Sequence, residues 1–268
     1  MAWFTDKVVL VTGGTDGIGK ALVNALMRQG AKVVACGRNY DKLYQLQTIY
    51  AGKPLIALST DVSSESECKQ LIAQTIKNYG KLDVLINNAG ISMRALFSET
   101  SLDTLHKVMD TNFWGAVYCT KYALPYLINQ KGTVVGISSV AGYRGLPGRS
   151  GYSASKFALQ GWMEAIRTEL MDSGVNVMWV CPGFTRSNIR NAALNKNSVP
   201  QGETPLNENI LMSPEECASH ILTAIEKRKR TLVLTRQGKE TVLLNRFLPS
   251  FADKMVHKFF FKNGVLVK

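Results

Sequence analysis

The sequence predicts a single α/β domain with a doubly wound parallel sheet of about seven strands, flanked by helices. Short Val- and Ile-rich runs alternate with longer stretches of helical periodicity along most of the chain. The runs are apolar at successive positions, as in strands that helices cover on both faces. A length of 268 residues suits one such domain, and 46% hydrophobic residues can fill a large core.

Each element follows from this alternation. The expected strands are Val8–Thr12, Lys32–Cys36, Leu55–Ser59, Val84–Ile86, Thr133–Ser138, Asn176–Cys181 and Thr231–Thr235. The expected helices are 17–29, 40–50, 64–79, 101–129, 151–173 and 213–228. Strands and helices in this order favour right-handed crossovers between neighbouring parallel strands.

Two segments depart from the pattern. The stretch 186–212 is rich in Asn, Pro and Gly, and irregular segments of this length in a compact domain are usually functional. We therefore expect a substrate lid there, with a disordered excursion as the alternative. We also divide the chain into a catalytic domain, 1–240, and a basic amphipathic C-terminal extension, 241–268.

The extension has apolar residues at helical spacing, with an interruption expected at Pro249-Ser250. They are Leu244, Leu248, Phe251, Met255 and Phe259, and the basic residues Arg246, Lys254, Lys258 and Lys262 surround them. A basic amphipathic helix can lie on an anionic membrane. It can equally pack on the core, on a second subunit or over the mouth of a pocket.

Composition narrows the classes of protein. The net charge of +12 permits binding to phosphates, acidic substrates or anionic membranes, or is simply a basic surface. We expect no nucleic-acid binding, because no groove of stacking aromatics accompanies the basic residues. No apolar run reaches the ~18 residues of a membrane span, and the N-terminus does not resemble a signal peptide. The five scattered cysteines form no CxxC pair, so we expect no disulfide framework and no metal site, and a cytoplasmic location.

A glycine-rich turn joins the first strand to the first helix. Gly13 can adopt the positive φ of a tight turn, Gly17 lets the backbone approach a pyrophosphate, and Gly19 allows close helix packing. The helix N-terminus then faces the phosphates. The spacing G-x-x-x-G-x-G is neither G-x-G-x-x-G nor a Walker loop.

The end of the second strand indicates which dinucleotide binds. An acidic residue there would bind a ribose 2′-hydroxyl, whereas an arginine would bind a 2′-phosphate. The chain has Gly37 and Arg38, so we expect NADP(H) in preference to NAD(H). Asp16 complicates this expectation, because it places negative charge near the same phosphate.

Three residues with proton chemistry follow the fifth strand. Tyr152 and Lys156 are four residues apart and share one face of a helix, and Ser139 ends an apolar run upstream. A phenol titrates near ~10 when unperturbed. A neighbouring ammonium group favours the phenolate, so we expect a lowered pKa and an acid/base near neutral pH.

These residues resemble the short-chain dehydrogenase/reductase family over roughly 7–235, which implies a Rossmann-like fold. The motifs that carry the resemblance are Thr12-Gly-Gly-Thr-Asp-Gly-Ile-Gly19, Asp61 in Thr60-Asp-Val62, Asn87-Asn-Ala-Gly90, Asn112, Ser139, Tyr152, Lys156, Pro182-Gly183, Thr185 and Ser187. The cofactor residues implied are Gly13, Thr15, Asp16, Gly17, Ile18, Gly19, Arg38, Asp61, Val62, Asn88, Ala89, Gly90, Tyr152, Lys156, Pro182, Gly183, Thr185 and Ser187.

The resemblance implies reversible carbonyl reduction. Tyr152 would give a proton to the carbonyl oxygen, and Ser139 would hydrogen-bond that oxygen. Lys156 would lower the phenol pKa and bind the nicotinamide ribose, and Asn112 would hold a water of a proton relay. The resemblance also implies a homodimer or homotetramer, through the helices near 101–129 and 151–173.

The substrate is less well determined. Apolar side chains among the expected pocket walls, Ser92–Leu96, Tyr143–Leu146 and Phe184, favour a hydrophobic or lipid-like carbonyl compound. Arg94, Arg144 and Arg149 could accept an acidic group, or could be exposed or structural. The alternative function is a non-catalytic NADP(H)-sensing or membrane-associated binding protein on the same fold.

Overall fold

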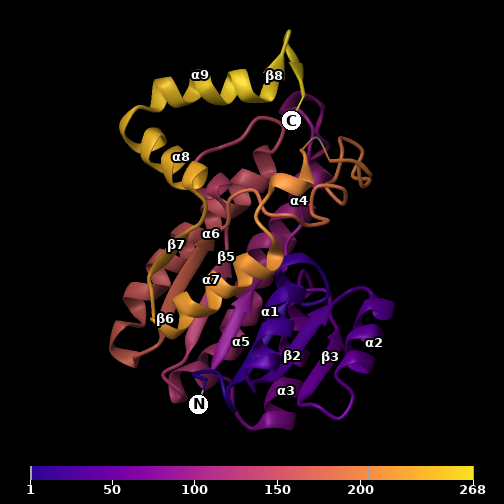
Figure 1. Cartoon of the computed structure of the whole chain (residues 1–268), viewed down its shortest axis with the longest axis vertical. Coiled ribbons are helices and arrows are strands. Elements are labelled where there is room, and N and C mark those ends of the chain that lie inside the picture. Colours follow the sequence, from indigo (N-terminus) through magenta and orange to yellow (C-terminus); the bar gives the residue numbers. More distant parts are fainter. Residues whose placement is uncertain (1, 205, 268) are drawn as a thin grey trace.

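The computed structural model describes residues 2–204 and 206–267. Within this part, seven parallel strands form one sheet in the order β3-β2-β1-β4-β5-β6-β7 (Figure 1). The strands are β1 Val8–Thr12, β2 Lys32–Gly37, β3 Leu55–Ser59, β4 Val84–Asn87, β5 Thr133–Ile137, β6 Asn176–Cys181 and β7 Thr231–Val233. The predicted doubly wound parallel sheet is confirmed.

Most helices match the predicted stretches. They are α1 Gly17–Arg28, α2 Tyr40–Ile49, α3 Glu65–Tyr79, α6 Ser150–Glu169 and α7 Pro214–Glu226. The single helix expected over 101–129 is instead divided into α4 Leu102–Met109, a π-helical turn Asp110–Trp114 and α5 Gly115–Asn129. Such turns occur often at functional sites, and this one contains Asn112. The helix expected over 151–173 ends at Glu169, before a 3₁₀ turn Met171–Ser173.

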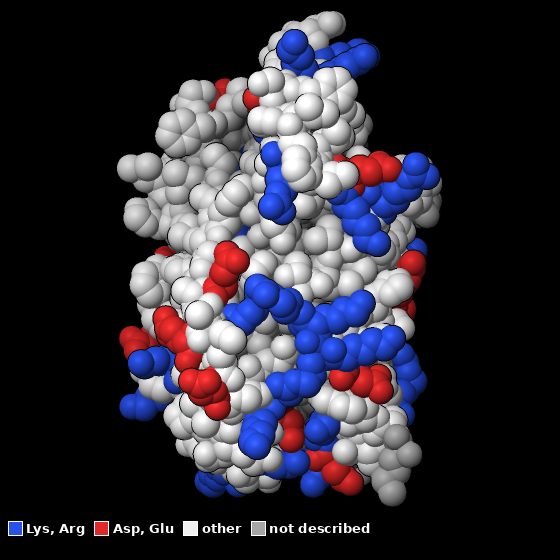
Figure 2. All heavy atoms as spheres, turned by 90° about the vertical axis from the view of Figure 1, so that its left-hand side faces the viewer, with Lys and Arg blue, Asp and Glu red and all other residues white. Residues whose placement is uncertain are grey.

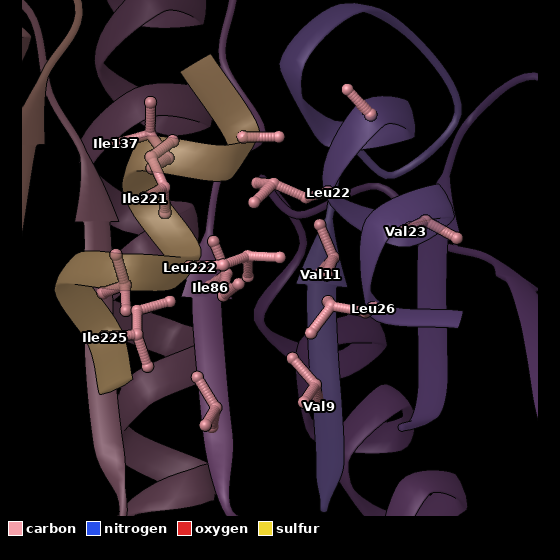
Figure 3. Packing of buried hydrophobic residues seen from close by; sticks show 14 of the residues in the cluster. Val9, Val11, Leu22, Val23, Leu26, Ile86, Ile137, Ile221, Leu222 and Ile225 are labelled. Atoms are coloured by element: carbon pink, nitrogen blue, oxygen red, sulfur yellow. The ribbon is translucent and has the colours of Figure 1, made fainter. Parts of the chain in front are cut away.

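Helices cover the sheet on both faces, which explains why its strands are apolar at successive positions. On one face, Val9, Val11 and Ile86 pack against α1 and α7 (Figure 3). On the other face, α3, α5 and α6 pack against Leu10 and Leu85. Removing this much apolar surface from water is the main favourable contribution to folding.

The sheet also fixes where a ligand can bind. The strand order reverses between β1 and β4, and open α/β sheets bind ligands in the crevice at the carboxyl ends of the strands at such a point. Thr12 and Asn88 hold the two strand ends together: Thr12 Oγ1 accepts hydrogen bonds from the backbone N–H groups of Asn88 and Ala89, each at 3.0 Å. Asn88 Nδ2 donates to the Thr12 carbonyl at 2.9 Å.

The C-terminal residues form an arm beyond this end of the sheet (Figure 1). It consists of α8 Arg236–Phe247, α9 Pro249–Phe260 and a hairpin of β8 Phe261–Lys262 and β9 Val265–Leu266. The helix is interrupted at Pro249-Ser250, as expected. Pro249 begins α9, because Pro fits the first turn of a helix. The boundary at 240/241 lies inside α8, and the hairpin was not predicted. No helix among residues 2–204 and 206–267 is long and apolar enough to span a bilayer.

Candidate active site

A cavity of about 580 Å³ lies at the carboxyl ends of the central strands. Apart from Asn112, each predicted catalytic and cofactor-binding residue lines this cavity. The lining therefore brings together the glycine turn, Arg38, Asp61, the proton-bearing residues and the segment after β6.

The glycine turn adopts the shape that close approach to a phosphate needs. Gly13 and Gly17 have φ values of +63° and +46°, a region that side chains disfavour. A Cβ on Gly19 would lie 2.1 Å from the Gly13 carbonyl oxygen, so only glycine fits there. Asp16 caps α1, with its Oδ1 accepting from the Gly17 N–H at 2.7 Å.

Two ion pairs lie where the turn meets the end of β2. Lys42 Nζ lies 2.5 Å from Asp16 Oδ2, and Arg38 Nη1 lies 3.7 Å from Asp61 Oδ2. Lys42 lines the cavity and was not among the predicted site residues. Its charge offsets that of Asp16, which removes the complication that the sequence raised.

The phenol pKa of Tyr152 is raised, whereas the sequence led us to expect a lowered pKa. Burial raises the pKa of Tyr152 above its ordinary value, and this effect exceeds the lowering by a hydrogen bond with Ser139 and by the charges of Arg149 and Arg190. Removing the phenol from water disfavours its charged form, and neighbouring charges compensate only in part. The phenol is therefore protonated at neutral pH.

Lys156 is turned toward the sheet. Its Nζ donates to the Ile137 carbonyl at 2.8 Å and lies 5.7 Å from the centroid of the Tyr152 ring. Burial lowers the pKa of Lys156 to about 8. The charges that favour the Tyr152 phenolate come from Arg149 and Arg190, rather than from Lys156 as the sequence led us to expect.

Asn112 uses its side chain to fix the loop after β4. Its Nδ2 donates to the Ile91 carbonyl and to Ser155 Oγ, both at 2.9 Å, and its Oδ1 accepts from the Ile91 N–H at 2.8 Å. The amide hydrogens are thus both used. A water can bind this side chain only through the second lone pair of Oδ1.

The C-terminal arm forms part of the cavity wall. Leu244 of α8 and Met255 and Phe259 of α9 line it, and the Phe259 ring stacks on Phe184 at 6.3 Å between centroids. Of the expected walls, Ser92, Leu146 and Phe184 line the cavity. Met93 and Leu96 do not. Of the four arrangements that the sequence left open for the extension, the structure has it over the pocket mouth.

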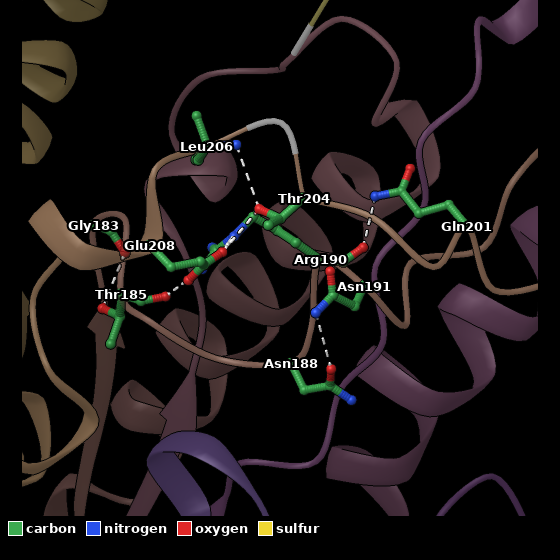
Figure 4. A network of polar contacts seen from close by, with 9 residues as sticks. All are labelled: Gly183, Thr185, Asn188, Arg190, Asn191, Gln201, Thr204, Leu206 and Glu208. Atoms are coloured by element: carbon green, nitrogen blue, oxygen red, sulfur yellow. Dashed lines mark hydrogen bonds and ion pairs between the residues drawn. The ribbon is translucent and has the colours of Figure 1, made fainter.

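The segment 186–212 is held by a network around Arg190 (Figure 4). Arg190 Nε and Nη2 each donate to the Glu208 carboxylate at 2.6 Å, and Nη2 also donates to the Thr185 carbonyl at 2.8 Å. Thr204 Oγ1 donates to Glu208 at 2.8 Å. The Arg190 guanidinium lowers the pKa of Glu208, as expected of a bidentate pair.

Comparison with known proteins decides the family. The family model described as short chain dehydrogenase matches residues 7–198. The chain belongs to this family. It is therefore an oxidoreductase of the short-chain dehydrogenase/reductase (SDR) type, and the resemblance seen in the motifs is confirmed.

Relatives extend over most of the chain. The mouse (Mus musculus) protein named dehydrogenase/reductase SDR family member 7B is 34% identical over 242 residues, which are 87% of this chain and 75% of that protein. The Arachis hypogaea protein named 11-beta-hydroxysteroid dehydrogenase A is 34% identical over 260 residues, 92% of this chain and 73% of that protein. The chain also resembles the crystal structure of an SDR protein from Burkholderia phymatum in complex with NAD, with a TM-score of 0.82 and 23% sequence identity. The match covers 94% of this chain and 96% of that chain. This last likeness shows the fold.

Sequence reasoning placed neither the arm nor Lys42 at the cavity. The arm was found as an amphipathic pattern, but periodicity alone does not say what such a helix covers. Lys42 stands four residues after Arg38, inside the expected helix 40–50, where a lysine usually marks an exposed face. Its proximity to Asp16 depends on the packing of α2 beside the glycine turn.

Proposed function

We propose that the protein reduces a hydrophobic carbonyl compound with NADP(H), and oxidises the corresponding alcohol in reverse. One observation carries the proposal: Ser139, Tyr152 and Lys156 line the same cavity as the glycine turn. A pure cofactor sensor has no need of a protonated phenol and a hydroxyl at the open end of a dinucleotide site.

The residues present fit a nicotinamide dinucleotide. The positive φ values at Gly13 and Gly17 and the N-terminus of α1 make a cradle for the pyrophosphate. Pro182, Gly183, Thr185 and Ser187 would hold the nicotinamide end, and Asp61 and Val62 the adenine end. The cofactor supplies the hydride that the carbonyl carbon accepts.

The protein supplies the proton and the positioning. Tyr152 donates its proton to the carbonyl oxygen, and its raised pKa keeps the phenol in the form that reduction requires. Ser139 hydrogen-bonds the same oxygen, an interaction that strengthens as the oxygen gains charge. Lys156 would bind the ribose hydroxyls of the nicotinamide half. Asn112 keeps the loop after β4 in place through its hydrogen bonds to the Ile91 backbone.

Charge at the end of β2 favours NADP(H) over NAD(H). Arg38 is largely exposed, and its 3.7 Å pairing with Asp61 is loose enough to be exchanged for a 2′-phosphate. Lys42 is paired with Asp16 and so offsets the negative charge beside the glycine turn.

The decisive experiment is NADPH oxidation with ketones and aldehydes graded by chain length. We expect kcat/KM to rise with apolar length, because Leu244, Met255 and Phe259 provide an apolar wall. NADH should support a lower kcat/KM than NADPH. A preference for small polar sugars would contradict the hydrophobic substrate. NADPH binding without turnover of any carbonyl would favour the alternative, a cofactor-sensing or membrane-associated protein.

Assembly and location follow as further parts of the proposal. Trp114, directly before α5, and Phe157 on α6 are 43% and 46% exposed, and such aromatics support a homodimer or homotetramer through these helices. The buried thiols of all five cysteines, each within the described residues, agree with a cytoplasmic protein. The exposed apolar residues Leu243, Phe247, Leu248 and Phe251 of the arm support peripheral contact with a membrane.

A further inference from the structure

A buried arginine lies beside Tyr152. Arg149 directly precedes α6, is only 8% exposed and lines the cavity together with Tyr152. Within residues 2–204 and 206–267 its side chain has no hydrogen bond or ion pair, and its Nε is fully enclosed. A guanidinium keeps its charge in proteins, and an unpaired buried charge is strongly unfavourable.

The neighbouring arginines, in contrast, both have carboxylate partners. Arg94 Nη1 lies 3.1 Å from Glu203, and Arg190 lies 2.6 Å from Glu208. Both arginines are close enough to Arg149 that their charges, after burial, contribute to lowering its pKa. Among the described residues, two of these three arginines thus have a carboxylate partner, and the charge of Arg149 is left unbalanced at the cavity. The positive end of α6 adds to this potential.

We propose that Arg149 binds an anionic group of the carbonyl substrate, either a carboxylate or a phosphate monoester. Arg149 stands three residues before Tyr152, so the acidic group would lie close to the carbonyl that Tyr152 protonates. Ser92, whose Oγ is buried without a partner among the described residues, lines the same cavity and offers a second donor. The apolar remainder of the substrate would lie along the arm. This inference rests on the proposed carbonyl reduction, and it narrows the substrate to an amphipathic acid.

Matched pairs of substrates test the charge directly. One pair is a long-chain 4-oxoacid and its methyl ester, and the other is a long-chain ketone with a phosphate monoester and the same ketone with a free alcohol. We expect the ratio of kcat/KM, charged over neutral, to fall roughly ten- to hundredfold in Arg149→Gln. Arg149→Lys should retain part of the ratio, because it keeps the charge but loses the planar fork. The pair with the larger fall identifies the acid.

Arg28→Gln is the matched control, because Arg28 is an exposed arginine in the last turn of α1. This variant should keep the wild-type ratio. A wild-type ratio in Arg149→Gln would overturn the proposal. Equal losses for both members of a pair, together with a shifted pH profile, would also overturn it, because Arg149 would then act on the Tyr152 proton. If Arg149→Gln does not fold, Arg149→Lys is compared with the wild type instead.

A binding measurement separates this inference from the proposed function. The NADPH-loaded protein is titrated calorimetrically with laurate and with dodecyl phosphate, neither of which contains a carbonyl that can be reduced by this chemistry. Weaker binding of at least one of them to Arg149→Gln than to wild type is expected. If no carbonyl is turned over but this difference is found, carbonyl reduction fails and the anion site stands. Equal affinities in both proteins would overturn the anion site alone.

Discussion

At the scale of single residues, the role proposed for Tyr152 is the least replaceable. Burial raises the pKa of its phenol, so the group is an acid at neutral pH rather than the readily ionised phenolate that Lys156, four residues away, led us to expect. We expect Tyr152→Phe to lower kcat by about 10²- to 10⁴-fold, the usual contribution of a general acid. NADPH affinity, measured by fluorescence titration, should change little, because the ring and its packing are kept. Wild-type turnover in this variant would refute the assignment.

We expect Lys156 to make the stability of the cofactor-free protein depend on pH. Its pKa is about 8 when folded and 10.5 as the ordinary value, so between these limits the unfolded chain binds a proton that the folded protein does not. The free energy of unfolding contributed by Lys156 therefore rises with pH through this window, by up to about 3 kcal/mol.

Urea unfolding of wild type and Lys156→Met at pH 7.0 and at about pH 10 measures this contribution. We expect the difference between the two proteins to shift in favour of wild type at the higher pH. The hydrogen bond to Ile137 is lost in the variant at both pH values, so its effect largely cancels. The same difference at both pH values would contradict the buried, easily deprotonated state of Lys156.

At the scale of elements, the glycine turn and α1 form a unit that admits no side chain at Gly19. A Cβ there would lie 2.1 Å from the Gly13 carbonyl oxygen and 2.5 Å from Asn88 Nδ2. Gly19→Ala must therefore displace the turn from the end of α1. We expect loss of NADPH binding and destabilisation by about 1–3 kcal/mol, the usual cost of overpacking.

Gly161→Ala is the control for Gly19→Ala. Gly161 lies inside α6, and a Cβ there would meet no atom within 4 Å. This variant should be more stable than wild type by about 0.5–1 kcal/mol, because alanine favours the helix, and it should bind NADPH normally. Thermal unfolding and NADPH titration of both variants provide the test. Unimpaired NADPH binding by Gly19→Ala would mean that the turn can move without harm to the site.

Elements also show where sequence reasoning stops. Short runs of consecutive apolar residues make an unmistakable pattern, so β1 to β6 were predicted to within one residue at each end. The break of 101–129 at Asp110–Trp114 could not be predicted, because the sequence there contains no Pro or Gly to signal it. The turn depends on Asn112 reaching the Ile91 backbone, 21 residues away, and a contact of that kind exists only after the sheet has formed.

In the whole molecule, the sheet and the C-terminal arm differ in how well the sequence predicts their positions. The site residues predicted from motifs come together because the carboxyl ends of parallel strands lie at one edge of the sheet. The parallel topology alone determines this arrangement. The position of the arm depends instead on side-chain contacts. Arg144 Nη2 pairs with Asp253 at 2.5 Å, and Phe184 stacks on Phe259. These contacts join segments more than 70 residues apart in sequence, and helical periodicity contains no information about them.

The arm has two apolar sides, and only one of them faces the cavity. The outer side exposes Leu243, Phe247, Leu248 and Phe251, by 60%, 66%, 55% and 53%. Figure 2 shows the upper end of the molecule, where the arm lies, as mostly uncharged with basic side chains near its tip. Exposed apolar residues beside lysine and arginine have the chemistry that binds an anionic lipid surface. A substrate with an apolar chain could then enter the cavity beneath the arm directly from the membrane.

We therefore expect the full-length protein to sediment with vesicles that contain anionic lipid, and more weakly at high salt. Phe247→Ser combined with Phe251→Ser should lower the partition coefficient by about tenfold or more, because each phenylalanine contributes about 1.5–3 kcal/mol when buried. Neither side chain lines the cavity, so kcat/KM for a short, water-soluble ketone should stay near wild type.

Tyr44→Ser, which removes a 62% exposed aromatic from α2, is the control and should leave vesicle binding intact. Equal sedimentation of the double variant and wild type would mean that the outer side of the arm meets another surface, such as a second subunit. Analytical ultracentrifugation of the same variant would then detect the loss of a dimer.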